Sequence, residues 1–300
     1  MIELAPDSPG LPPSARRKRA ALLADMRARI GAGRLGVAFS GGVDSTLLLA
    51  LCVEALGAER CLAVTARSAS LAQDEWAACQ RLAAQLGVEL VALETRELER
   101  AAYRQNGPDR CYHCKTELFE RVDDEVVERY GLSAVAYGAT ADDLGDHRPG
   151  MAAAREHAVL APLADAGLTK AEIRALSQAL GLPTWNKPAQ PCLASRVPYG
   201  EEVTAAKLGR IDAAEALLHR VGLREARVRH HESAGAPLAR LEVPVADLPH
   251  ALTHRDELVQ GLRDLGFHYV VLDLEGFRSG RQNDVLKAQR LLPTVQGERS

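Results

Sequence analysis

The sequence predicts an α/β fold with a doubly wound, mainly parallel sheet, followed by a smaller α+β domain. Short apolar runs alternate with stretches of helical length through the first half of the chain. One glycine-rich loop, SGGVDS at 40–45, directly follows such a run and precedes an apolar helix. This alternation is typical of βαβ units, whose right-handed crossovers place a ligand at the carboxyl ends of the strands.

The first half of the chain contains four candidate strands separated by candidate helices. A helix is expected over about 14–30, with Ser14 as its N-cap and Gly31 after its last residue. The expected strands cover 35–39, 61–66, 88–94 and 133–139, and the further helices cover 46–56, 73–87 and about 115–130.

After about residue 200 the pattern changes. A helix over 204–221 precedes two candidate paired strands, REARVRHH and LARLEV, and a helix over 245–265 precedes the strand FHYVVLDL. This αββαβ order predicts a separate small domain, with boundaries at 1–200 and 201–300.

Composition limits the partners that we expect. The chain has 300 residues and a net charge of −3, without the basic balance of a nucleic-acid-binding protein. The first twenty residues lack the apolar core of a secretory signal, and no apolar run is long enough for a membrane span. We therefore expect a cytoplasmic location, reduced cysteines, and neither nucleic-acid nor membrane binding.

Two glycine patterns lie close together. The first, from Gly31 to Gly36, matches GxGxxG but precedes its strand, whereas a dinucleotide-binding loop follows its strand. A helix C-cap and a turn explain it better. The second, SGGVDST at 40–46, follows the strand and opens the helix, so its backbone N–H groups can surround a phosphate. It lacks the Gly-Lys-Ser/Thr ending of a Walker A loop.

The second pattern resembles the PP-loop of the ATP pyrophosphatase family, which cleaves ATP between the α- and β-phosphates to adenylylate a substrate oxygen. A tight turn with Asp44 as a helix cap is the alternative. The residues expected to bind ATP and its phosphates are Ser40, Gly41, Gly42, Asp44, Ser45 and Thr46.

The six cysteines fall into two groups. Cys52, Cys61 and Cys79 lie within expected helices or strands, where cysteine packs as a small apolar residue. Cys111 and Cys114 form a C-x-x-C pair that we expect in a loop before a helix, where iron–sulfur, zinc and redox interpretations compete.

Cys192 lies in KPAQPCLASR at 187–196, a loop that Pro188 and Pro191 stiffen. Arg196 could lower the pKa of this thiol or bind a phosphate. Cys192 is a candidate nucleophile or ligand, and a buried thiol that anchors the loop is the alternative. Together, Cys111, Cys114 and Cys192 would leave one iron of a 4Fe–4S cluster open.

Several stretches together resemble the LarE family of ATP-dependent sulfur transferases, which serve the nickel-pincer nucleotide cofactor. They are AFSGGVDSTLLL (38–49), NGPDRCYHCKTELF (106–119), YGATADDLGDHRPG (137–150), the segment 161–200 that contains PCLASRVPYG, and LEGFRSGRQN (274–283). The resemblance implies adenylylation of the carboxylates of pyridinium-3,5-biscarboxylic acid mononucleotide and their conversion to thiocarboxylates. ATP with Mg²⁺ would be consumed, and AMP and pyrophosphate would leave.

The resemblance also implies roles for single residues. In relatives with only the PCLASR cysteine, that residue gives up its sulfur and becomes dehydroalanine. Relatives that also carry the C-x-x-C pair resemble 4Fe–4S enzymes that transfer a cluster-bound sulfide, and Cys111, Cys114 and Cys192 match that variant. Homo-oligomers are expected. The residues implied in catalysis are Cys192, Asp44 and Glu215, and those implied in nucleotide or phosphate binding include Asp142, Asp143, Arg148, Arg196, Arg227 and Arg229.

Each of these residues has an alternative interpretation. Asp142, Asp143 and Arg148 could form a capped turn with a surface arginine. Arg227 and Arg229 alternate on one strand and so share a face, which suits a phosphate clamp but also suits a solvated sheet face.

Three other function classes compete. A PP-loop tRNA thiolase would need a basic surface for its polyanion. An amide synthetase of the NAD or GMP synthetase type would leave the three special cysteines without a role. A nucleotide-binding module with zinc at Cys111 and Cys114 would release no pyrophosphate.

Overall fold

A four-stranded parallel sheet forms the centre of the first half of the chain. Its strands are β1 (Arg34–Ala38), β2 (Cys61–Arg67), β3 (Glu89–Glu94) and β4 (Leu132–Tyr137). They pair in the order β3-β2-β1-β4, and each adjacent pair is parallel. The predicted α/β class with a mainly parallel sheet is therefore confirmed.

The computed structural model describes residues 11–145, 149–278 and 280–284. The chain divides into two units, Met1–Cys192 and Leu193–Ser300, each with its own sheet. The change of unit falls immediately after Cys192, ahead of the position near 200 at which the sequence pattern changes.

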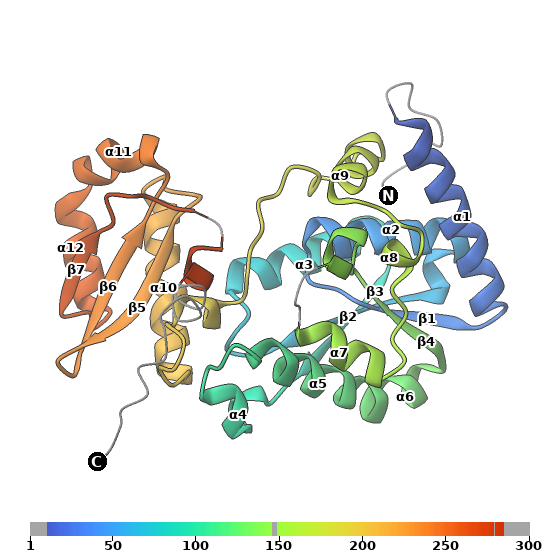
Figure 1. Ribbon diagram of the computed structural model, residues 1–300, viewed down its shortest axis with the longest axis horizontal. Coiled ribbons are helices and arrows are strands. Elements are labelled where there is room, and N and C mark those ends of the chain that lie inside the picture. Colours follow the sequence, from blue (N-terminus) through green and yellow to red (C-terminus); the bar gives the residue numbers. More distant parts are fainter. Residues whose placement is uncertain (1–10, 146–148, 279, 285–300) are drawn as a thin grey trace, which may run out of the picture. The chain divides into compact units, whose positions relative to one another are not determined.

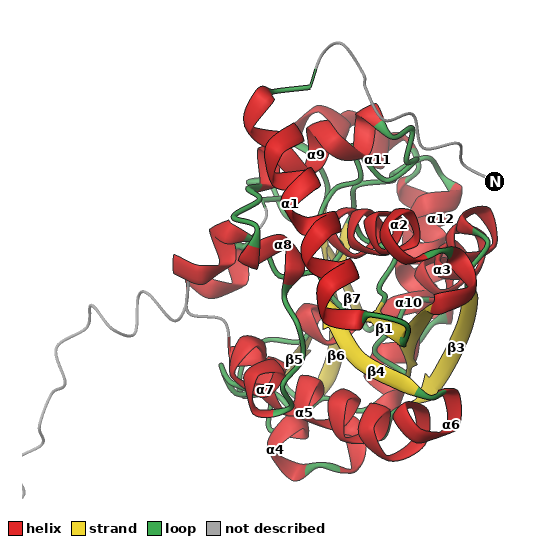
Figure 2. Ribbon diagram, turned by 90° about the vertical axis from the view of Figure 1, so that its right-hand side faces the viewer, coloured by secondary structure: helices red, strands yellow, loops and turns green. Residues whose placement is uncertain are grey.

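Helices cover both faces of the first sheet (Figures 1 and 2). They are α1 (Pro13–Ile30), α2 (Val43–Leu56), α3 (Gln73–Leu86), α4 (Ala101–Arg104), α5 (Arg110–Val122), α6 (Glu128–Tyr130), α7 (Pro149–Glu156), α8 (Pro162–Asp165) and α9 (Lys170–Ala179). Figure 1 shows α1 and α2 on one side of the sheet, and α5 and α7 on the other.

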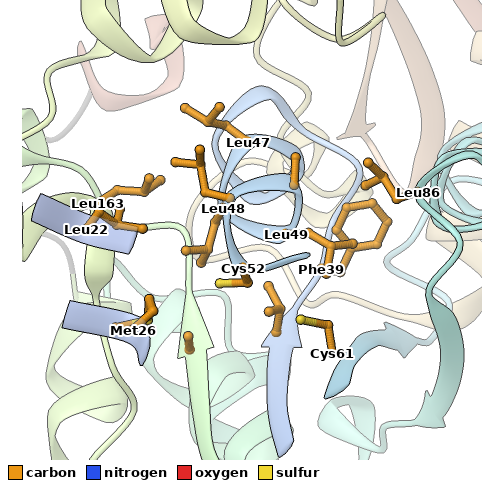
Figure 3. Close-up of a cluster of buried hydrophobic side chains, with 14 of the residues drawn as sticks. Leu22, Met26, Phe39, Leu47, Leu48, Leu49, Cys52, Cys61, Leu86 and Leu163 are labelled. Atoms are coloured by element: carbon orange, nitrogen blue, oxygen red, sulfur yellow. The ribbon is translucent and has the colours of Figure 1, made fainter. Parts of the chain in front are cut away.

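Strand residues alternate between two apolar cores, as the two-residue period of a strand requires. Val37 and Ala63 join the core beneath α1 and α2, whereas Leu62 and Val64 join the core beneath α5. Figure 3 shows Cys52 and Cys61 among the leucines of the first core. Both thiols are almost fully buried, as is that of Cys79, which confirms that these three cysteines fill the core.

Two local predictions are wrong. Helix α1 begins at Pro13 with Pro12 as its N-cap, because a proline with fixed φ suits the first helical turn, so Ser14 is not the cap. Cys111 and Cys114 lie in the first turn of α5, not in a loop. Nothing after Pro108 prevents the chain from entering the helix at Arg110.

The second unit is a three-stranded sheet covered by helices. Strands β5 (Arg227–Ser233) and β6 (Ala236–Glu242) are antiparallel, and β7 (Tyr269–Leu272) is parallel to β6. The helices are α10 (Ala205–Arg220), α11 (Leu248–Thr253) and α12 (Arg255–Asp264). Leu217, Leu262, Val228 and Leu241 belong to the core between helices and sheet.

The single helix predicted over 245–265 is wrong, because the segment is divided. Pro249 lies at the start of α11, behind a short 3₁₀ turn at Val245–Asp247. His254 then leaves the helical region, with φ −97° and ψ 16°, before α12 begins. In the described part of the chain, no helix has the length and apolar character needed to span a bilayer.

The buried His230 makes the second unit sensitive to acid. Burial, followed by the charges of Lys207 and Arg210, lowers the pKa of His230 to about 4. The unfolded chain binds this proton near pH 6.5, so stability is lost as the pH falls from about 6.5 toward 4. Between pH 7 and pH 5, we expect the His230→Gln variant to lose about 2 kcal/mol less unfolding free energy than the original chain.

Urea denaturation of the full chain at the two pH values measures this difference. His268→Gln is the control, because His268 is exposed. An equal loss of stability in the original chain and in His230→Gln would contradict the assignment.

Candidate functional site

The loop Ser40–Gly42 links the end of β1 to the start of α2. Two hydrogen bonds to β2 hold Phe39, the residue before the loop. Phe39 N donates to Val64 O at 2.8 Å, and Thr65 Oγ1 donates to Phe39 O at 2.7 Å. Gly41 has φ +65°, a conformation that favours glycine. This strand–loop–helix arrangement is the one predicted from SGGVDS.

Hydroxyl groups hold the turn from inside. Ser45 Oγ accepts from Ser40 N at 3.3 Å and lies 3.1 Å from Ser40 Oγ. Thr46 is fully buried, and its hydroxyl has no partner among the described residues. Ser45 therefore shapes the loop, and the N–H groups at the start of α2 remain the main donors for an anion.

The loop lies where the strand order reverses. The chain passes from β1 to β2 and β3, then returns to place β4 on the other side of β1. Such a reversal opens a crevice at the carboxyl ends of the strands. Gly138 follows β4 there, and a Cβ at this position would lie 3.0 Å from Ser45 N and 3.2 Å from Asp44 C.

Two lysines from distant segments contact this loop. Lys170, the first residue of α9, pairs through its ammonium with Asp44. Lys187 Nζ lies 2.7 Å from Glu75 Oε2 and donates to Gly41 O at 3.1 Å. The loop thus has two cations beside it although its own sequence contains none.

A hollow of about 420 Å³ opens at the carboxyl ends of β2 and β3. Its lining includes Arg67, Ser68, Trp76 and Thr95. The Arg67 guanidinium lies 5.4 Å from the centre of the Trp76 ring. A flat ring system therefore finds both an aromatic face and a cation in this hollow.

The acidic loop after β4 contacts the start of α9, beside the glycine loop. Asp142 Oδ2 accepts from Lys170 N at 2.6 Å, so it caps the start of α9. Asp143 is buried and accepts from Thr140 N and Thr140 Oγ1, both at 2.9 Å. Asp143 thus shapes a turn, while Asp142 lies at the surface. Arg148 lies outside the described residues.

Of the three cysteines singled out by the sequence, Cys192 acts electrostatically on the other two. Desolvation, followed by the charge of Cys192, raises the pKa of both Cys111 and Cys114 above the usual range. Cys111 and Cys192 reach the surface and Cys114 is half-buried, and no cysteine is in a disulfide. His113 contacts Asp109 at 3.1 Å.

A tyrosine that we did not predict is influenced by the cysteine centre, the name used here for Cys111, Cys114 and Cys192. Tyr103 is buried, and its hydroxyl lies 2.6 Å from Ser70 Oγ. Desolvation, followed by the charges of Cys192 and Cys114, raises the pKa of Tyr103 above its usual range, so the phenol stays protonated at neutral pH. The Tyr103 hydroxyl thus contacts Ser70 and is reached by the charges of two of these cysteines.

The cysteine centre has the sulfur donors for a metal cluster but not an assembled ligand set. Across the described ranges, no group of three or more His, Cys, Asp and Glu side chains is arranged to hold a metal ion. Thiols are the donors that iron–sulfur clusters use. Binding a cluster would require the thiols to lose their protons and to move closer together.

In the second unit, buried charges hold Ser195 and Arg196, at the end of the PCLASR segment. Arg196 donates to both carboxylate oxygens of Glu215 at 2.9 Å. Arg229 donates to Glu242 at 2.9 Å and to Ser195 O at 2.8 Å. The side chains of Arg196 and Glu215 are 3% and 8% exposed. Glu215 is therefore engaged in an ion pair, and its catalytic role stays a prediction.

Arg227 and Arg229 are buried, so the alternative of a solvated sheet face is wrong. Burial, followed by the charges of Arg196 and Arg229, lowers the pKa of Arg227 to about 10. The guanidinium lies 5.1 Å from the centre of the Phe277 ring. An anion such as phosphate would offset this crowding of positive charge.

Comparisons with known proteins fit this description. A family model described as NAD synthase matches residues 17–127, which include the glycine loop. The chain is 38% identical to the pyridinium-3,5-bisthiocarboxylic acid mononucleotide synthase of Lactiplantibacillus plantarum, over 85% of this chain and 91% of that protein. The chain belongs to the LarE family.

Two further proteins are similar to the chain over most of their length. An uncharacterized protein of Synechocystis is 42% identical over 83% of this chain and 92% of its own. An uncharacterized protein of Methanocaldococcus jannaschii is 28% identical over 81% of this chain and 90% of its own.

In this LarE-family chain, sequence reasoning missed four residues at the sites. Lys170, Lys187, Gly138 and Tyr103 lie far in sequence from the residues they contact or influence. Lys187 opens the KPAQPC stretch, yet no local pattern links it to the glycine loop.

Replacing Gly138 tests the position of the loop. We expect Gly138→Ala to weaken ATP binding by about tenfold or more, since the new methyl group displaces the first turn of α2. Calorimetric titration measures the affinity. Gly209→Ala is the control, because a Cβ at Gly209 meets open space. Equal affinity in both variants would contradict the role of Gly138.

Replacing Glu215 tests its structural role. We expect Glu215→Gln to lower the unfolding free energy by about 3 kcal/mol or more, because it removes the buried negative charge that Arg196 contacts through two nitrogens. Urea denaturation measures this, and Asp256→Asn, at an exposed ion pair, is the control. Unchanged stability in Glu215→Gln would show that the pair is dispensable for folding.

Proposed function

We propose that this chain is an ATP-dependent sulfur transferase that converts the carboxylates of pyridinium-3,5-biscarboxylic acid mononucleotide to thiocarboxylates. One observation supports it above all: the first unit contains both a glycine loop at Ser40–Gly42 that opens a helix and two cysteines, Cys111 and Cys114, that the charge of Cys192 reaches. The name of the Lactiplantibacillus plantarum relative supplies the substrate class.

Activation would take place at the glycine loop. A carboxylate oxygen of the substrate attacks the α-phosphorus of ATP, the bond to the bridging oxygen breaks, and pyrophosphate leaves. The N–H groups at the start of α2 would stabilise the charge that develops on the leaving group. ATP would arrive with Mg²⁺, for which Asp44 is a candidate ligand. The hollow beside Trp76 suits a flat heterocycle.

Sulfur transfer would follow at the activated carboxyl carbon. A sulfur nucleophile attacks this carbon, the carbon–oxygen bond to the phosphate breaks, and AMP leaves. Cys111, Cys114 and Cys192 would hold a 4Fe–4S cluster, which would supply sulfide at its open iron. Tyr103 would donate a hydrogen bond near the sulfur atoms, and Arg227 with Arg229 would bind a phosphate group in the second unit.

The match to NAD synthase does not favour amide synthesis over sulfur transfer. It covers residues 17–127, which include the glycine loop that both reactions need. Cys192 lies outside that range. We also propose that the enzyme is cytoplasmic and forms homo-oligomers.

The product formed by the purified chain tests this function. Protein isolated without oxygen receives ATP, Mg²⁺, sulfide and the biscarboxylate mononucleotide, and mass spectrometry follows the small molecule and the protein. We expect repeated exchange of oxygen for sulfur, beyond one per subunit, with Cys192 intact. Cys111→Ala should lose repeated exchange, whereas Cys61→Ala, in the core, should retain it.

Two outcomes would contradict parts of the proposal. A single exchange with dehydroalanine at Cys192 would exclude the cluster and make that cysteine the sulfur donor. No exchange in protein that binds ATP would exclude this substrate.

A further inference from the structure

Lys187 belongs to two parts of the first unit at once. Its ammonium lies on the glycine loop, where it donates to Gly41 O at 3.1 Å, and its backbone begins the stretch that leads to Cys192. Pro188 and Pro191 lie between Lys187 and Cys192, so this short connection has little freedom to change length or direction.

The ammonium of Lys187 has capacity for a further acceptor. A lysine carries three donor hydrogens. Within the described residues, its contacts are Gly41 O and Glu75 Oε2, at 3.1 and 2.7 Å. With the side chain about 20% exposed, the third hydrogen can reach an anion that enters the loop.

Arg174 holds the main chain around Lys187. Arg174, on α9, donates to Trp185 O at 2.9 Å and to Lys187 O at 3.0 Å. The main chain at Lys187 is thus anchored on α9, while the side chain of Lys187 reaches the glycine loop. The stretch 188–192 then extends from a fixed point toward the cysteine centre.

We propose that Lys187 is a positioning residue that couples phosphate in the glycine loop to the order of the segment that carries Cys192. The inference rests on the proposed function, because it takes ATP as the source of the phosphate. An entering phosphate gives the ammonium its third acceptor. The side chain then becomes fixed between loop and phosphate, and the stretch that follows it loses freedom.

Lys170 provides the matched comparison. It also places an ammonium beside the loop, through Asp44, but it lies on α9 and is not joined to Cys192 by a short stretch. Removing either lysine removes the same charge from the nucleotide site. Only the removal of Lys187 should disconnect that site from the Cys192 segment.

Hydrogen exchange measured by mass spectrometry tests this coupling in the full chain. The ligand is an ATP analogue with a methylene group between the α- and β-phosphorus atoms, so no adenylate forms. In the original chain, we expect saturating analogue with Mg²⁺ to slow exchange of the peptide covering 184–192 by about fivefold or more. Calorimetry gives the concentration that saturates each variant.

The variants separate coupling from charge. Lys187→Met should bind the analogue more weakly and, even when saturated, show no slowing of this peptide. Lys187→Arg should restore the slowing, and Lys170→Met should bind weakly yet retain it. Slowing that persists in saturated Lys187→Met would overturn the inference.

The original chain also distinguishes the inference from the proposed function. Binding of the analogue without slowing of the 184–192 peptide would overturn the coupling alone. Absence of binding would overturn the proposed use of ATP and the coupling with it.

Discussion

The packing of Gly138 against the first turn of α2 is the constraint on which the proposed nucleotide site depends. A parallel sheet brings the ends of β1 and β4 together, and only a residue without a side chain leaves the backbone at Asp44 and Ser45 where it is. The hydrogen bonds from Phe39 and Thr65 then fix the loop from the other side. A phosphate-binding loop needs this rigidity, because its donors are backbone groups that cannot adjust separately.

Charge at the loop is supplied from a distance. A Walker A loop has its lysine within the motif, whereas this loop receives Lys170 and Lys187 from the segment after β4. In the structure, each ammonium is paired with a carboxylate, Asp44 or Glu75, so the region carries balanced charge before a nucleotide enters. The charge of a phosphate can then be met by cations that are already oriented beside the loop.

Residues that a short motif contains were predictable, and residues that only the fold brings together were not. SGGVDS after an apolar run indicated both the loop and the parallel sheet, because the spacing of strand, loop and helix is local. Gly138 and Lys187 carry no such local pattern. The predicted helix boundaries were wrong where a proline determines the start of the helix, at Pro12, Pro13 and Pro249.

The buried ion pairs of the second unit bear on how Cys192 could act. Arg196, with Glu215, and Arg229, through Ser195 O, anchor the residues that directly follow Cys192. Lys187 and Arg174 anchor the residues that precede it. Within the first unit, the main chain is thus fixed at Lys187, so only a short stretch before Cys192 remains to be ordered when the thiol becomes a ligand or a nucleophile, which favours either use.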